Sequence, residues 1–256
     1  MRTSPVVTAL SAAMWCAALS PVASAAEFNV LSATGIREVV EDLVPKFERS
    51  TGHKATVGFA NAGTILRRLA EGEAADMIIL PREAVDGLVK DSKATADSFV
   101  VIARAGIGVA VRKGASKPDI STPDAFKQTL LAAKSITYLD PAGGGVSGVH
   151  LTKVFDRLGL ANDIKAKTVF HRNAAEAGAF IIDGKAEVGM NLIPELLPIA
   201  GIDVVGPLPA DLQLTNIYAA ALTSNAKDPT AGKALADFLR SPEAVSLIKA
   251  KGMDPG

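Results

Sequence analysis

The order of the apolar segments most constrains this chain, because strand-like and helix-like patterns alternate along most of its 256 residues. Residues 27–32 are typical of a strand, and the apolar residues within 36–47 then recur at helical spacing. Residues 76–80 form a nearly continuous apolar run, as expected for a strand that is buried on both faces. Regular alternation of this kind predicts an α/β fold, in which helices cover a parallel sheet.

One long extended stretch, residues 98–111, breaks the alternation. It has two glycines in its second half and no helical pattern between its halves, so we interpret it as a crossover from one lobe to another. A second series of strands and helices follows, and residues 216–223 form a candidate return path. We therefore expect two α/β lobes with a ligand cleft between them. Lobe 1 would contain residues 26–104 and 206–256, and lobe 2 would contain residues 105–205.

The first 25 residues have the layout of a secretory signal peptide. Arg2 supplies a positive start, an apolar stretch covers residues 6–19, and Ala23 and Ala25 provide small residues at a cleavage site after Ala25. The apolar stretch is too short to span the roughly 30 Å of membrane hydrocarbon. We expect export to the periplasm, cleavage, and no membrane insertion of the mature protein.

The composition of the remaining chain excludes several kinds of site. The single cysteine, Cys16, lies in the expected signal peptide, so the mature protein would have neither a disulfide nor a cysteine metal site. No pair of histidines has metal-ligand spacing, and we expect neither a metal nor a cofactor. The chain has 27 basic and 27 acidic residues, whereas nucleic-acid binding requires a concentrated basic surface.

Three loops rich in small residues follow expected strands and lead into expected helices. Ligands of open α/β sheets bind at such carboxyl ends of strands, and a helix start offers unpaired N–H groups and a positive dipole end. Together the loops predict an anion site that needs no formal charge. The candidate ligand-binding residues in them are Ser32, Ala33, Thr34, Gly35, Asn61, Ala62, Gly63, Thr64, Gly145, Ser147 and Gly148.

Two further strand ends add candidates of other kinds. Ligand contacts are expected there from Arg172, Asn173, Ala174, Asn191 and Leu192. An arginine would bind a carboxylate through two hydrogen bonds. If the protein is an enzyme, its base would come from His150, His171 or Glu176, although no convincing nucleophile–base pair is present.

From Phe28 to about Lys251 the chain resembles the periplasmic molybdate-binding protein family of ABC transporters. The matching segments include residues 30–35, 59–64 and 67–80, followed by Asp140-Pro141 with Ser147-Gly148, then residues 187–189 and 238–244. The resemblance implies a type II periplasmic-binding fold, a small anionic ligand and an ABC transporter permease as partner. We expect a monomer.

The departures from that family concern the anion site. Members that bind molybdate typically present a serine hydroxyl from each of the first two loops, where this chain has Gly35 and Ala62. Losing two hydroxyl donors should weaken a closed shell around a tetrahedral oxyanion. The expected ligand is therefore either a molybdate-like oxyanion or an organic carboxylate. A branch of similar appearance includes aconitate isomerase, which makes a periplasmic isomerase of a small tricarboxylate the alternative.

Overall fold

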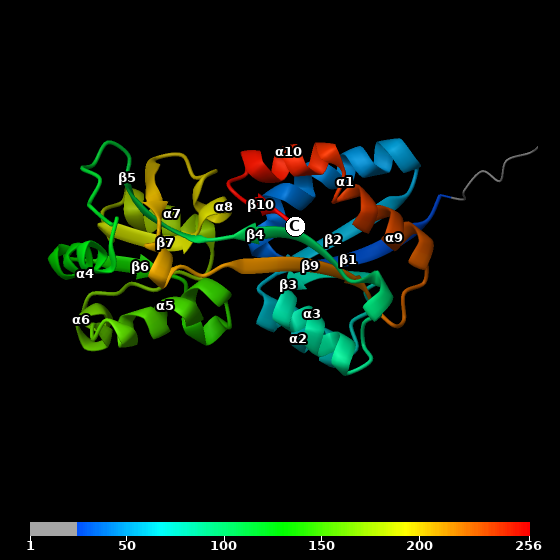
Figure 1. Ribbon diagram of the computed structural model, residues 1–256, viewed down its shortest axis with the longest axis horizontal. Helices are drawn as coiled ribbons and strands as arrows, with labels where there is room; N and C mark the ends of the chain where they lie inside the picture. The colour runs from blue at the N-terminus through cyan, green and yellow to red at the C-terminus, as the bar shows by residue number, and fades with distance from the viewer. Residues whose placement is uncertain (1–24) are drawn as a thin grey trace, which may run out of the picture.

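The computed structural model describes residues 25–256, which form two α/β lobes joined by extended segments (Figure 1). The predicted signal peptide lies outside the described residues, apart from Ala25. The chain leaves the first sheet at Ala105 and enters the second at Ile107, and it returns between Pro207 and Asn216. None of the described helices is both long enough and apolar enough to cross a membrane.

The first lobe contains a sheet with the strand order β10-β4-β9-β3-β1-β2. Strand β3 is buried along its whole length, which explains its continuous apolar sequence. Helices α1, α9 and α10 lie on one side of this sheet and α2 and α3 on the other (Figure 1). The strands of the first sheet are β1 (Glu27–Ala33), β2 (Lys54–Ala60), β3 (Met77–Pro81), β4 (Val100–Ala105), β9 (Asn216–Leu222) and β10 (Asp254–Pro255).

The second lobe is built on a smaller sheet with the strand order β6-β7-β5-β8. Helices α5 and α6 lie on one side of it, and α7 and α8 lie on the other (Figure 1). Its strands are β5 (Ile107–Arg112), β6 (Ile136–Tyr138), β7 (Val188–Leu192) and β8 (Ile202–Pro207).

Two helices begin with residue types that favour a helix start. Thr122 and Ser241 accept hydrogen bonds from Ala125 N–H and Ala244 N–H, and in both helices a proline occupies the first helical position. The helices are α1 (Arg37–Thr51), α2 (Ala62–Ala70), α3 (Arg82–Lys90), α4 (Pro123–Ala132), α5 (Val146–Arg157), α6 (Ala161–Ala166), α7 (Ala174–Ile182), α8 (Ile193–Leu196), α9 (Pro229–Phe238) and α10 (Pro242–Ala250). A short 3-10 turn, η1 (Thr34–Ile36), precedes α1.

The expectation of parallel sheets is wrong for three strands, and one of them, the short β10, pairs antiparallel with β4. Strand β9 pairs antiparallel with β3 and β4, and β5 pairs antiparallel with β7 and β8. Both strands adjoin the connections between the lobes, so each runs opposite to the strands that βα units place beside it. The parallel pairs are β1 with β2, β1 with β3, and β6 with β7.

Candidate functional site

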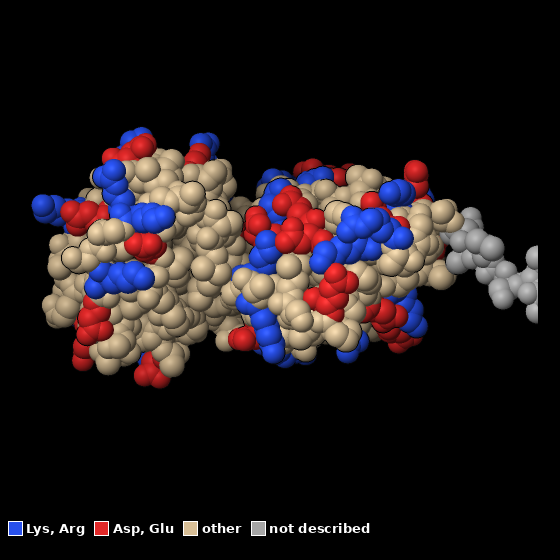
Figure 2. Space-filling model, turned by 90° about the horizontal axis from the view of Figure 1, so that it is seen from above, with Lys and Arg blue, Asp and Glu red and all other residues tan. Residues whose placement is uncertain are grey.

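Two cavities lie between the lobes, and Figure 2 shows the furrow that separates the lobes on one face of the molecule. The inner cavity has a volume of about 20 Å³, room for one oxygen-sized group. The outer cavity has about 680 Å³, which is within the usual range for small-molecule sites. Thr34, Gly35, Asn61, Leu139 and Glu195 line both cavities, so the two are neighbouring parts of one cleft.

Twelve of the candidate ligand-binding residues line this cleft. The inner cavity includes Ala33, Thr34, Gly35, Asn61, Ala62, Gly145, Ser147 and Leu192. The outer cavity adds Thr64, Arg172, Asn173 and Ala174. The other four candidates, Ser32, Gly63, Gly148 and Asn191, line neither cavity.

Two helices direct uncapped N-termini at the inner cavity. Helix α2 begins after Asn61 and α5 begins after Gly145, and in neither case does a side chain accept a hydrogen bond from the first turn. By contrast, Asn173 caps α7 by accepting the N–H of Glu176. The first-turn N–H groups of α2 and α5 therefore remain available to a ligand, and the helix dipoles favour a negative one.

Polar side chains link the loops that surround the inner cavity. The hydroxyl of Thr34 donates to Asn61 Oδ1 at 3.2 Å, which ties the first two loops together. In the other lobe, the hydroxyl of Ser147 donates to Asn191 Oδ1 at 3.0 Å, and both side chains are fully buried. Asn191 therefore holds the Ser147 side chain in place without lining either cavity. Its Nδ2 atom has no hydrogen-bond partner among the described residues.

Tyr218 on β9 explains why position 35 is glycine. A Cβ atom at Gly35 would lie 1.9 Å from the Tyr218 hydroxyl and 2.7 Å from Leu192 Cδ1. The phenol oxygen thus fills the space that a side chain at position 35 would need. Burial raises the pKa of Tyr218 well above its usual value, so the hydroxyl stays protonated and can donate. Tyr218 lines the inner cavity and brings a hydroxyl group to the loop that lacks the serine.

Glu195 on α8 is the acidic group nearest the centre of the cleft, because it lines both cavities. The residue is half-buried. Burial raises the pKa of Glu195 to about 7, against the smaller lowering effects of Thr34, Asn191 and Arg37. The sequence pattern gave no reason to select this residue, since α8 is a single short turn.

Two arginines line the outer cavity from opposite lobes. Arg37 on α1 lies 4.2 Å from the centre of the Phe59 ring and pairs with Glu41 at 3.0 Å. Arg172, before α7, pairs with Glu176, and its side chain is 80% exposed. Exposed ion pairs of this kind contribute about 0–1 kcal/mol, so either guanidinium could exchange its partner for a ligand carboxylate at little cost.

The three candidate bases lie outside both cavities. His150 Nε2 lies 2.8 Å from the carbonyl oxygen of Leu212. His171 is fully buried, its Nδ1 lies 3.0 Å from the hydroxyl of Thr137, and burial lowers its pKa to about 4. The bond to Arg172 lowers the pKa of Glu176 and keeps that carboxylate ionised.

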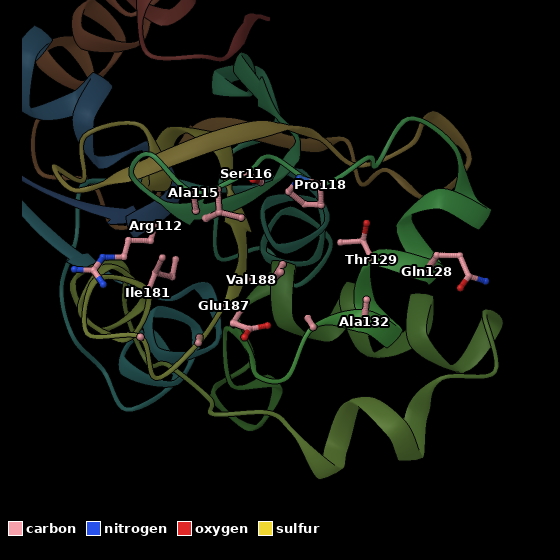
Figure 3. A pocket seen from close by; sticks show the side chains of 14 residues that line it. Arg112, Ala115, Ser116, Pro118, Gln128, Thr129, Ala132, Ile181, Glu187 and Val188 are labelled. Carbon is pink, nitrogen blue, oxygen red and sulfur yellow. The ribbon is translucent and has the colours of Figure 1, made fainter.

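A separate pocket lies on the outer part of the second lobe and is here called the distal pocket (Figure 3). Arg112, Pro118, Thr129, Ile181 and Glu187 are among its lining residues, none of them a candidate from the sequence. Its volume is about 620 Å³ and its lining is mostly apolar. Among residues 25–256, no three His, Cys, Asp or Glu side chains come together as a metal site requires.

Comparisons with known proteins agree with this architecture. Over 233 residues, the chain is 36% identical to an aconitate isomerase from a Pseudomonas species, covering 89% of this chain and 87% of that protein. It is 27% identical over 260 residues to the molybdate-binding protein ModA of Azotobacter vinelandii, covering 97% and 96% of the two chains. The solved structure of the periplasmic molybdate-binding protein of Azotobacter vinelandii superimposes with a TM-score of 0.74 at 19% identity, covering 90% of this chain and 99% of that one.

The family model for bacterial extracellular solute-binding proteins matches residues 28–254, which is nearly all of the described chain. The match includes nearly all of both sheets, the two connections between them and every residue that lines the cleft. The chain therefore belongs to the family of bacterial extracellular solute-binding proteins.

Proposed function

We propose that this protein captures a small organic anion with more than one carboxylate group in the cleft between its lobes. The observation that carries the proposal is the division of the cleft into two parts. The inner cavity has room for one oxygen-sized group beside the open N–H groups of α2 and α5, and the outer cavity adds Arg37 and Arg172. One carboxylate would bind inside, and others would bind the two arginines.

The size and shape of the cleft favour such a ligand over a tetrahedral oxyanion. Molybdate or tungstate would leave most of the 680 Å³ outer cavity unfilled. Position 35 cannot contribute a serine hydroxyl while Tyr218 occupies the space beside it. A ligand with a carbon skeleton would use both the N–H groups inside and the charged groups outside.

A thermal-shift series tests the ligand class. Citrate, trans-aconitate and tricarballylate would be compared with molybdate, tungstate and sulfate at equal ionic strength. A ligand present at 100 times its dissociation constant stabilises the folded state by about 2.7 kcal/mol. We expect at least one polycarboxylate to raise the melting temperature by several degrees. A large shift with molybdate alone would overturn the polycarboxylate assignment.

Replacement of Arg37 by Gln should weaken binding of the polycarboxylate that shifts the melting temperature. Losing a hydrogen bond to a charged group costs about 1.5–3 kcal/mol, so we expect a roughly tenfold to hundredfold rise in Kd by calorimetry. Arg82→Gln is the matched control, because Arg82 also pairs with a carboxylate four residues later and lies over Phe99, outside the cleft. Equal effects of the two substitutions would remove Arg37 from the site.

Lobe closure would then present the captured ligand to a membrane permease. In this proposal residues 26–104 with 206–256 and residues 105–205 are the two moving bodies. The proposal includes export, cleavage after Ala25, a monomeric protein in the periplasm and an ABC transporter permease as partner. Mass spectrometry of the protein secreted by its bacterial host would locate the N-terminus and test the cleavage directly.

A second candidate function is isomerisation of a small tricarboxylate, supported by the 36% identity to the aconitate isomerase and by the position of Glu195. Moving a double bond by one carbon requires a base to remove a proton from one carbon and return it to another. A carboxyl group whose pKa is about 7 can do both at neutral pH. Thr34, Tyr218 and the open N–H groups would stabilise the charge that develops on the substrate carboxylate.

Incubation with cis-aconitate, followed by chromatography, tests this candidate. An isomerase would form the trans isomer until equilibrium is reached. In deuterium oxide the product would carry deuterium if the proton exchanges with solvent while it is on Glu195. Glu195→Gln should abolish turnover while binding persists. Absence of conversion in the unmodified protein would leave solute capture alone.

A further inference from the structure

Glu195 is a carboxyl group inside a cleft that otherwise attracts anions. It lies on α8, lines both cavities, and shares the inner cavity with the starts of α2 and α5. An anion drawn in by the open N–H groups would come to lie beside this carboxyl group. Adjacent negative charges repel strongly where water is largely excluded. Binding therefore favours a state in which one of the two partners carries a proton.

The charged groups nearest Glu195 come from the first lobe. Arg37 on α1 attracts the carboxylate form. Glu38, also on α1, lines the outer cavity, and Lys251 pairs with it at 3.5 Å. Tyr218 on β9 is neutral, because burial and the charge of Glu195 both raise its pKa. One guanidinium thus faces Glu195, and an incoming anion would compete with Glu195 for it.

The cations on the second-lobe elements that pack against α8 either lie outside the cleft or are already paired. Strand β7 has no titratable side chain, and β5 and β8 each have one. Arg112 lines the distal pocket, and Asp203 accepts the N–H of Gly114 at 2.8 Å. Before and on α7, Arg172 and Glu176 are bound to each other.

The proton state of Glu195 can respond to a ligand because its two forms are close in free energy at neutral pH. Burial raises the pKa of this carboxyl group to about 7. A negative charge placed beside it would raise the pKa further, by the same mechanism that separates the pKa values of paired carboxylates. The group would then take a proton from solvent at pH values where it was ionised before.

We propose that capture in this cleft is proton-linked: Glu195 takes up a proton as an anionic ligand enters, and its neutral carboxyl group then donates a hydrogen bond to that ligand. The inference rests on the proposed anion capture and goes beyond it, since it assigns a proton as the second species bound. It also sets a pH dependence. Affinity for a fully ionised ligand falls as pH rises above neutrality, by up to about tenfold per unit.

Isothermal titration calorimetry in buffers of different ionisation enthalpy measures the proton directly. Citrate, trans-aconitate and molybdate would each be titrated into the full mature protein in HEPES and in Tris, at pH 7.5 and pH 8.5. We expect uptake of about half a proton or more per bound anion at pH 7.5. We also expect affinity to weaken several-fold between the two pH values.

Two variants assign the proton. Glu195→Gln keeps a hydrogen-bonding group of similar size but cannot titrate, so binding should persist with no uptake and with less dependence on pH. Glu83→Gln changes an exposed carboxylate on α3 that lines neither cavity, and this variant should behave as the unmodified protein does. Circular dichroism would check that both variants fold.

Each outcome decides the proposal. Binding whose enthalpy is the same in both buffers would overturn proton linkage and leave anion capture standing. Equal proton uptake by Glu195→Gln and the unmodified protein would remove Glu195 as the carrier. If none of the three anions binds, the proposed function fails, and proton-linked capture fails with it.

Discussion

The residues that give this cleft its chemistry come from positions far apart in the sequence. The small-residue loops could be selected because each follows a strand and precedes a helix. Tyr218 could not be selected, since only the return of the chain to the first sheet as β9 brings its hydroxyl beside Gly35. Arg37 begins the long helix α1 and Glu195 lies in the four-residue turn α8, and only folding brings them to one cavity. A single sequence therefore identifies the loops of a binding site better than it identifies the side chains that other elements bring to those loops.

His171 should make the protein sensitive to acid. Its pKa is about 4 in the folded state, lowered by burial from an ordinary value of 6.5. Between these values the unfolded chain binds the proton and the folded protein does not, so stability is full above pH 6.5 and is lost as pH falls toward 4. At pH 5 the loss from this residue should be about 2 kcal/mol.

Urea denaturation of the unmodified protein and of His171→Gln, at pH 7 and pH 5, measures this effect. The variant should lose less stability on acidification, since its side chain does not titrate. Glu195→Gln serves as the opposite case. The raised pKa of Glu195 means that the free energy of unfolding of the unmodified protein decreases as pH rises from 4.5 to 7. The Gln substitution removes this loss, so it should increase stability most at high pH. An unchanged pH slope in His171→Gln would contradict the assignment.

Secondary structure was most predictable where a pattern is long. The paired strands and helices of both lobes follow the alternation in the sequence, whereas α8 was missed because four residues are too few to show a period. The second series of strands and helices also predicts a strand at residues 167–170, but this segment forms only the isolated bridge between Thr168 and Ile136. The omission of α8 also concealed Glu195, so a missed element led directly to a missed site residue.

The start of α5 depends on glycine at position 148 for steric reasons. A Cβ atom there would lie 2.1 Å from the carbonyl oxygen of Leu139. Gly148→Ala should therefore destabilise the protein by about 1–3 kcal/mol, although alanine favours helix. Gly87→Ala, at a helical position with nothing within 4 Å, is the matched control and should stabilise by up to about 1 kcal/mol. Thermal unfolding and ligand affinity would both be measured, because displacing the α5 N-terminus should also weaken binding.

At the scale of the whole molecule, hydrogen bonds to Ile107 join the two connections between the lobes. The side chain of Gln213, in the returning segment, accepts the N–H of Ile107 at 2.7 Å and donates to the carbonyl oxygen of Ile107 at 2.9 Å. Ile107 begins β5, directly after the outgoing crossover. The Gln213 amide thus joins the two crossover segments, together with the N–H of Leu208, which donates to the same carbonyl oxygen at 3.0 Å. Rotation of the lobes must be absorbed at this place.

Gln213→Ala should loosen this connection without disrupting either lobe. The N–H of Ile107 would lose its partner, which costs about 1–3 kcal/mol if the group stays buried, whereas the carbonyl oxygen of Ile107 keeps its bond from the N–H of Leu208. A wider range of lobe orientations makes closure entropically more costly, so ligand affinity should fall although Gln213 lines neither cavity. Small-angle X-ray scattering should give a larger radius of gyration for the unliganded variant.

Gln128→Ala, an exposed position on α4, is the control for the same chemical change. If Gln213→Ala lowers stability but leaves both affinity and radius unchanged, the amide only supports local packing and the hinge lies elsewhere.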